Sequence, residues 1–113
     1  MADQGAPGSP RESMHRVGSI NEFTEGHVRG FRINGTDVAV VKRGDRFIAF
    51  YNCCTHSAFG FDHLDLNPDG SLTCVGHGAM FDMNTGVPIT GPAGGQLAMY
   101  KSSVEGDEVF VSL

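Results

Sequence analysis

Two cysteine–histidine pairs are the residues of this chain whose types and spacing are best suited to metal chemistry. The first pair is Cys54-Thr55-His56, the second is Cys74-Val75-Gly76-His77, and residues 57–73 lie between them. Thiolates and imidazoles bind both zinc and iron. If two loops bring the pairs side by side, two thiolates and two imidazoles converge on one site. The predicted metal ligands are therefore Cys54, His56, Cys74 and His77.

The order of the ligands within each pair separates two kinds of site. Zinc also accepts two cysteines and two histidines, but zinc-finger spacing places the two cysteines together and the two histidines together. Here each pair supplies one of each, which fits a binuclear iron–sulfur cluster with both thiolates on one iron and both imidazoles on the other. Gly76 and Gly78 flank His77, and small residues let backbone N–H groups approach the cluster sulfides. The pattern favours iron–sulfur, and a zinc-stabilised binding module without redox role is the alternative.

The other reactive side chains nearby are interpreted as structural. Cys53 sits beside a predicted ligand and would point the opposite way on an extended strand, so we interpret it as a small buried hydrophobe. His63, beside Asp62 and Asp65, is interpreted as a solvated surface histidine. The acidic residues Asp62, Asp65 and Asp69 fit a solvated face and, equally well, a surface that steers a basic partner. No Ser/His/Asp set, carboxylate pair or phosphate-binding loop is evident in the sequence. We therefore expect no enzymatic activity of the chain itself.

Turn signals divide the chain that must position these pairs. Asn34-Gly35 is a strong hairpin signal, because both central residues of a type I′ turn need a positive φ. Further turns are predicted at Gly44-Asp45, Asp69-Gly70, Asn84-Thr85-Gly86 and Gly106-Asp107. No segment between them keeps a helical 3.6-residue period over a long stretch. Short strands are therefore expected instead of long helices.

The segments between the turns have strand-like patterns. Residues 38–41 are continuously apolar, as expected of a strand buried on both faces. Shorter strand patterns occupy residues 31–33, 46–51 and 109–111. The stretch from about residue 52 to 95 is loop-rich and holds all three cysteines. These patterns predict a small all-β sandwich or barrel in which loops carry the chemistry.

Length and composition restrict the possible partners and location. A chain of 113 residues suits one domain, and its net charge of −5 argues against nucleic acid or an anionic membrane as partner. Residues 1–13 are rich in Gly, Pro and Ser and are predicted to be a disordered N-terminal tail before one domain over 14–113. The longest apolar run is far below the roughly 20 residues of a membrane-spanning helix. We expect a soluble, cytoplasmic protein.

Several motifs together resemble those of the Rieske ferredoxins of multicomponent ring-hydroxylating dioxygenases. They are the two ligand pairs and, after them, Phe81-Asp82, Thr85-Gly86 and Gly91-Pro92-Ala93. The resemblance covers nearly all of the chain after the tail. It implies a Rieske fold for residues 14–113, with three stacked antiparallel β-sheets and a small cluster-binding sub-domain of two loops.

The resemblance also implies the cofactor and the role of each ligand. It implies one [2Fe–2S] cluster, with Cys54 and Cys74 on the inner iron and His56 and His77 on the outer iron. Residues 91–93 would be the proline loop that covers the cluster. Respiratory Rieske proteins have a further cysteine in each loop and hydroxyl donors near the cluster, which this sequence lacks. A low reduction potential is therefore expected, about −150 mV at the bottom of the Rieske range.

The function implied is electron transfer within a multicomponent oxygenase system. The chain would carry single electrons from an NAD(P)H-dependent flavin reductase to a terminal, aromatic-ring-hydroxylating oxygenase, through transient contacts with both. Phe59, Met80 and Pro92 would form a partly apolar docking surface. A second reading is a Rieske-like small subunit of an NAD(P)H nitrite reductase, in which the same module works inside an enzyme.

Overall fold

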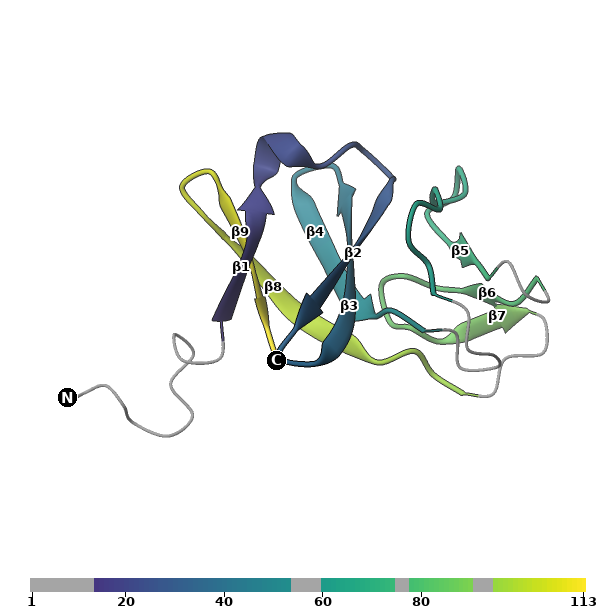
Figure 1. The fold of residues 1–113 in the computed structure, drawn as a ribbon. Coiled ribbons are helices and arrows are strands. Elements are labelled where there is room, and N and C mark those ends of the chain that lie inside the picture. Colours follow the sequence, from purple (N-terminus) through teal and green to yellow (C-terminus); the bar gives the residue numbers. More distant parts are fainter. Residues whose placement is uncertain (1–13, 54–59, 75–77, 91–94) are drawn as a thin grey trace.

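The computed structural model describes residues 14–53, 60–74, 78–90 and 95–113. Within these ranges the chain forms β-strands and one short 3-10 helix, η1 (Ile20–Glu22), but no α-helix (Figure 1). The prediction of an all-β fold is confirmed. The strands are β1 (Met14–Ser19), β2 (Val28–Ile33), β3 (Thr36–Arg43), β4 (Arg46–Tyr51), β5 (Leu72–Thr73), β6 (Met80–Phe81), β7 (Pro88–Thr90), β8 (Met99–Glu105) and β9 (Glu108–Ser112).

The predicted turns join neighbouring strands. Asn34 and Gly35, between β2 and β3, have φ values of 51° and 82°, which fits the type I′ hairpin predicted from this dipeptide. Gly44 turns the chain between β3 and β4 at a φ of 66°, and Gly106 does so between β8 and β9 at 63°. Because glycine adopts such angles without steric cost, these positions determine where each strand ends.

The strands are antiparallel and form two hydrogen-bonded sets (Figure 1). The larger has the order β1-β9-β8-β4-β3-β2 and the smaller the order β5-β6-β7. The long strand β8 pairs with β4 through Met99 and Tyr100, and with β9 through residues 101–105. Because β8 pairs with β4 at one end and with β9 along the rest, the larger set consists of two antiparallel sheets, β1-β9-β8 and β8-β4-β3-β2, which share this strand. With β5-β6-β7 they make up the antiparallel sheets that were predicted. We call β1–β4, β8 and β9 the framework, and residues 60–90 with β5–β7 the loop side.

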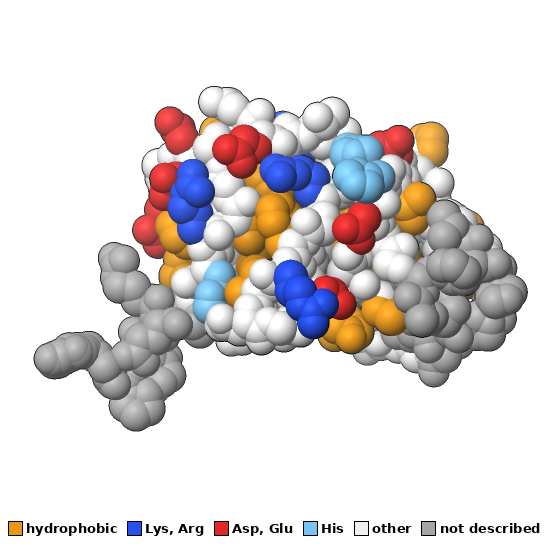
Figure 2. Space-filling view, viewed as in Figure 1, with side chains coloured by type: hydrophobic (Ala, Val, Ile, Leu, Met, Phe, Trp, Pro, Cys, Tyr) orange, Lys and Arg blue, Asp and Glu red, His pale blue; other side chains and the backbone are white. Residues whose placement is uncertain are grey.

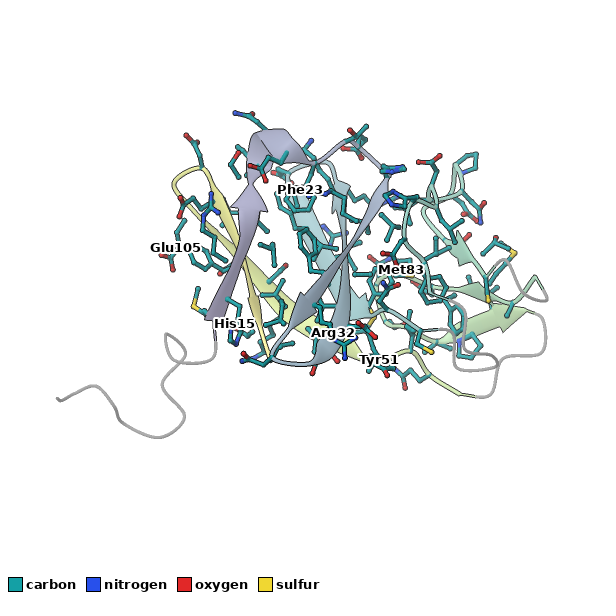
Figure 3. The ribbon with its side chains drawn as sticks, in the orientation of Figure 1. His15, Phe23, Arg32, Tyr51, Met83 and Glu105 are labelled. Carbon is teal, nitrogen blue, oxygen red and sulfur yellow. The ribbon has the colours of Figure 1, made fainter. Side chains whose placement is uncertain are left out.

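One set of buried side chains fills the framework. The ring of Phe23 lies among the strands (Figure 3), 5.2 Å from the ring of Phe47 in an edge-on arrangement. Burying such a side chain contributes roughly 1.5–3 kcal/mol to folding. The members of this framework core are Val17, Phe23, Val38, Val40, Phe47, Ala49, Val109 and Val111.

A second set of buried side chains lies between the framework and the three-stranded sheet, where Figure 3 shows Met83. Successive residues of a strand point to opposite faces, so β3 supplies Val38 and Val40 to the framework core but Ala39 and Val41 to this one. This explains why residues 38–41 are continuously apolar, and it confirms a strand buried on both faces. The loop-side core consists of Val28, Ala39, Val41, Ile48, Phe50, Phe61, Leu72, Cys74, Ala79, Phe81, Met83 and Leu97.

The N-terminal tail and the absence of a membrane-spanning helix were the two predictions about the chain as a whole. The predicted tail, residues 1–13, lies outside the described residues and stays a prediction. In the part of the chain that the structure describes, no helix has the length and apolar character needed to cross a bilayer.

Candidate metal centre

Cys74 is the predicted ligand whose surroundings the structure describes. It directly follows β5, is 2 % exposed and belongs to the loop-side core. The other three predicted ligands, Cys54, His56 and His77, lie outside the described residues. The structure therefore defines one donor directly and, for the others, the ends of the segments that contain them.

The segment that contains His77 begins and ends in a tight hairpin between β5 and β6. The N–H of Cys74 donates to the carbonyl of Ala79 at 2.7 Å, and the N–H of Gly78 donates to the carbonyl of Cys74 at 3.1 Å. Gly78 has a φ of 78°, which a residue with a side chain rarely adopts. These bonds hold the two ends of residues 75–77 together directly beside the buried thiol.

The segment that contains Cys54 and His56 is held at both ends. It leaves the framework after β4, where the N–H of Asn52 donates to the carbonyl of Asp37 at 2.9 Å. It re-enters the described structure before Phe61, whose ring is fully buried and lies edge-on to Phe81 at 6.1 Å between centroids. Phe61 and Cys74 belong to the same core, so both ligand-bearing segments start from one end of the domain.

A third stretch, residues 95–97, is attached beside these two. The N–H of Leu97 donates to the carbonyl of Gly86 at 2.7 Å, and the amide of Gln96 donates to the carbonyl of Thr85 at 2.8 Å. A Cβ atom at Gly86 would come within 2.3 Å of the Leu97 carbonyl oxygen. The two segments can therefore approach this closely only because residue 86 is glycine. The predicted proline loop, residues 91–93, lies outside the described residues.

The described donor fits an iron–sulfur ligand by its chemistry. Iron–sulfur clusters are held by soft cysteine thiolates, and Cys74 is a cysteine in an apolar core at the base of a hairpin. Within the described ranges, no three His, Cys, Asp or Glu side chains gather into a metal-binding group. The remaining donors would have to come from residues 54–56 and from His77.

Two histidines outside the predicted ligand pairs interact with each other and with an aspartate. His27 Nδ1 lies 2.8 Å from Asp65 Oδ1, and the rings of His27 and His63 are 5.8 Å apart. Figure 2 shows histidine side chains grouped beside acidic ones on this face. His63 is exposed, as predicted. Cys53 is half-buried, so its interpretation as a small buried hydrophobe is wrong. The cause is that Cys53 lies in a bend just beyond β4 and not on an extended strand.

The acidic residues of the loop side have specific partners as well as exposure to solvent. Asp69 accepts hydrogen bonds from both the hydroxyl and the N–H of Ser71, and these bonds hold the pKa of the Asp69 carboxyl below its ordinary value of 3.8. Asp62 accepts a hydrogen bond from the side-chain amide of Asn52. The sequence pattern does not predict this role of Asn52, because no spacing rule connects an asparagine to an aspartate ten residues away.

Comparison with known proteins adds to this geometry. Residues 13–101 match the family model of the Rieske [2Fe-2S] domain. Ferredoxin CarAc of Metapseudomonas resinovorans is 29 % identical over 98 residues, which cover 86 % of this chain and 91 % of the relative. The cytochrome b6-f complex iron-sulfur subunit of Chlorobaculum thiosulfatiphilum is 33 % identical over 96 residues, 85 % of this chain. This chain spans about half, 51 %, of the length of that subunit.

Solved structures agree with the fold. The ferredoxin of carbazole 1,9a-dioxygenase from Nocardioides aromaticivorans IC177 superposes with a TM-score of 0.82 at 28 % identity, covering 88 % of this chain and 97 % of that one. A chain in a complex of reduced oxygenase and oxidized ferredoxin in carbazole 1,9a-dioxygenase gives 0.80 at 28 % identity, covering 88 % and 93 %. The Rieske fold and one [2Fe–2S] cluster are therefore confirmed. The chain belongs to the Rieske [2Fe–2S] domain family.

Proposed function

We propose that this chain is the ferredoxin of a multicomponent oxygenase system. It carries single electrons from an NAD(P)H-dependent flavin reductase to a terminal oxygenase that hydroxylates aromatic rings. The observation that carries the proposal is the match, over nearly the full length of both chains, to the ferredoxin of a carbazole dioxygenase. A second support is the sequence match to ferredoxin CarAc, which covers 91 % of that protein.

The proposed ligands are those predicted from the sequence: Cys54, His56, Cys74 and His77. When bound, a cluster of this type accepts and returns one electron. The chain itself has two tasks. It keeps the thiolate of Cys74 in a buried core, and it holds the ends of both ligand-bearing segments.

The proposed docking surface lies on the loop side. Val87 and Ile89, before and within β7, are 45 % and 57 % exposed, and Met80 of the neighbouring strand β6 is half-buried. Met80 was predicted to be part of this surface together with Phe59 and Pro92, and the last two lie outside the described residues. A small, partly apolar surface is typical of the transient contacts of electron carriers. The cytoplasmic location remains part of the proposal, and cell fractionation would test it.

Spectroscopy of the purified protein tests the cofactor and its potential. We expect two irons and two acid-labile sulfides per chain, a Rieske paramagnetic signal on reduction, and a midpoint potential of about −150 mV. A colourless protein with one zinc would contradict the proposal in favour of the binding module. A midpoint well above 0 mV would contradict only the low potential.

Reconstitution tests the partners. We expect the reduced protein to be reoxidised by an aromatic-ring oxygenase and the oxidised protein to be reduced by a flavin reductase with NAD(P)H. Reoxidation by a nitrite reductase catalytic subunit, and not by the oxygenase, would favour the nitrite reductase alternative. Replacing His56→Cys or His77→Cys tests the ligands, since a normal Rieske spectrum in both variants would show that they are wrongly assigned.

A further inference from the structure

Asn52 joins the two ends of the segment that contains the first ligand pair. It follows Tyr51, which Figure 3 shows at the end of β4, and its backbone is tied to β3 through the carbonyl of Asp37. Its side-chain oxygen, Oδ1, accepts the N–H of Phe61 at 2.6 Å, nine residues farther along the chain. One half-buried amide therefore links the exit from the framework to the point of re-entry.

The other end of the same amide is also engaged. Asn52 Nδ2 donates to Asp62 Oδ1, so the side chain binds two consecutive residues, one through each polar atom. Asp62 in turn lies against β2 at Gly30, where an added Cβ would be 1.9 Å from Asp62 Oδ2. Gly30 therefore leaves the space that the carboxylate occupies, and the Asn52–Asp62 pair is seated on the sheet.

The residues after this pair are fixed by the backbone. The N–H of His63 donates to the carbonyl of Val28 at 2.9 Å, and the N–H of Val28 donates to the carbonyl of Leu64 at 2.8 Å. Phe61 anchors the same stretch in the loop-side core. Asn52 thus adds a direct side-chain link between the end of β4 and a stretch that is already attached to β2.

We infer that Asn52 is a positioning residue for the iron ligands Cys54 and His56. The inference rests on the proposed ligand set. The separation of the two ends of the segment limits where its ligand pair can lie, and the Asn52 side chain bonds directly across those ends. Groups that orient metal ligands without touching the metal commonly change metal retention when they are removed. Asn52 holds the ends of the segment with the first ligand pair, just as the backbone hydrogen bonds of Cys74 hold the ends of the segment that contains His77.

The test compares Asn52→Ala with Ser102→Ala in the full chain. Ser102 is a matched control, because its hydroxyl donates to the carbonyl of Phe47 within the framework and also links distant parts of the chain. The first readout is the rate at which the visible absorbance of the cluster disappears in the presence of an iron chelator. The second is hydrogen exchange of the Phe61 amide, which reports on the Asn52 bond whether or not iron is bound.

We expect Asn52→Ala to lose its cluster about tenfold faster than the natural protein and to exchange the Phe61 amide faster. Ser102→Ala should lower the melting temperature without changing either rate. An unchanged rate of cluster loss in Asn52→Ala, or the same acceleration in Ser102→Ala, would overturn the inference. If the natural protein holds no [2Fe–2S] cluster, the proposed function fails first, and this inference fails with it.

If Asn52→Ala does not fold, exchanging the side chains of Asn52 and Asp62 provides a second test. Asn52→Asp keeps the acceptor for the Phe61 N–H but places a second carboxylate against Asp62, so it should also accelerate cluster loss. The double variant Asn52→Asp/Asp62→Asn restores one amide donor opposite one carboxylate. We expect it to retain the cluster better than Asn52→Asp alone, and equal loss in the two variants would contradict a positioning role.

Discussion

Most strand pairings of the framework are long, with six residue pairs between β2 and β3 and between β3 and β4 and five between β8 and β9. The three strands of the loop side have only two or three residues each. β2 and β3 pair continuously from Val28↔Val41 to Ile33↔Thr36, while β5 and β6 share two pairs. The framework is therefore stabilised mainly by backbone ladders and by alternating apolar side chains. The loop side depends on individual contacts, such as the bonds of Asn52 and the burial of Phe61.

This difference separates two ways of losing stability. In the framework a weakened contact is shared among many neighbouring bonds of the same ladder. On the loop side a single side chain can be the direct connection between distant residues, so its loss changes local geometry more than global stability. Substitutions of the polar side chains that make such direct connections should affect cluster retention more than folding, whereas framework substitutions should affect folding without accelerating cluster loss.

The largest expected effect distinguishes two adjacent cysteines. Cys54→Ser removes a proposed thiolate ligand, and we expect complete loss of the cluster absorbance with the framework still folded. Cys53→Ser is the control, since Cys53 is half-buried and is not a proposed ligand. Visible absorption and circular dichroism measure both effects. If the cluster survives in Cys54→Ser, the ligand assignment is wrong.

The next effect compares one phenylalanine in each core. Phe61→Ala and Phe47→Ala each remove a buried ring, at 0 % and 7 % exposure, and should each lower the free energy of unfolding by about 3–5 kcal/mol. Only Phe61→Ala should also accelerate cluster loss, because it lies next to the ligand-bearing segment. Urea denaturation and chelator kinetics give the two quantities. If both variants lost the cluster equally faster, the loop side and the framework would not differ in their effect on cluster retention.

A smaller effect is expected where the framework contacts the loop side. Gly30→Ala should displace the Asp62 carboxylate and destabilise the protein by about 1–3 kcal/mol, because the added methyl group occupies its place. In the double variant Gly30→Ala/Asp62→Ala the clash is absent, so the two changes should not be additive. A double-mutant cycle from denaturation curves measures this coupling. Strict additivity would mean that the two residues do not compete for space.

The smallest effect concerns acid stability. The Gly44 N–H donates to Glu25, which lowers the pKa of the Glu25 carboxyl below its ordinary value of 4.5, and Ser71 does the same for Asp69. A carboxyl whose pKa is lower in the folded state contributes stability above its unfolded pKa and loses it as the pH falls. Glu25→Gln and Asp69→Asn should therefore each flatten the loss of stability below about pH 4.5. Steeper acid unfolding in either variant would contradict the assigned cause.

Local sequence patterns predicted most of the framework. Asn34-Gly35 predicted its hairpin because few residues accept a positive φ, and the apolar run at 38–41 predicted a strand between two cores. The sharing of β8 between two sheets was not predictable, because pairing with both β4 and β9 is a property of the assembled sheet. The short strands β5–β7 were missed for a related reason, since two residues carry no periodic signal.

The cofactor of the candidate site was predicted from the sequence, and the assignment of its four ligands stays a prediction. The residues that support the ligand-bearing segments were not predicted. The pair order around Cys74 indicated iron–sulfur from the residue types alone. The role of Asn52 depends on where Asp62 and Gly30 lie in space, and nothing in their spacing along the chain indicates it. The expected burial of Cys53 was wrong because a bend replaces the assumed extended strand there.

The alternation of side chains along β3 and β4 has a thermodynamic consequence. These strands form a common wall, and opening either core would expose the apolar side of the other. The two cores should therefore melt in one cooperative transition. A ligand that binds only the folded state stabilises every part of such a unit, however distant. The melting temperature, read by a probe anywhere in the framework, then becomes a measure of cluster occupancy.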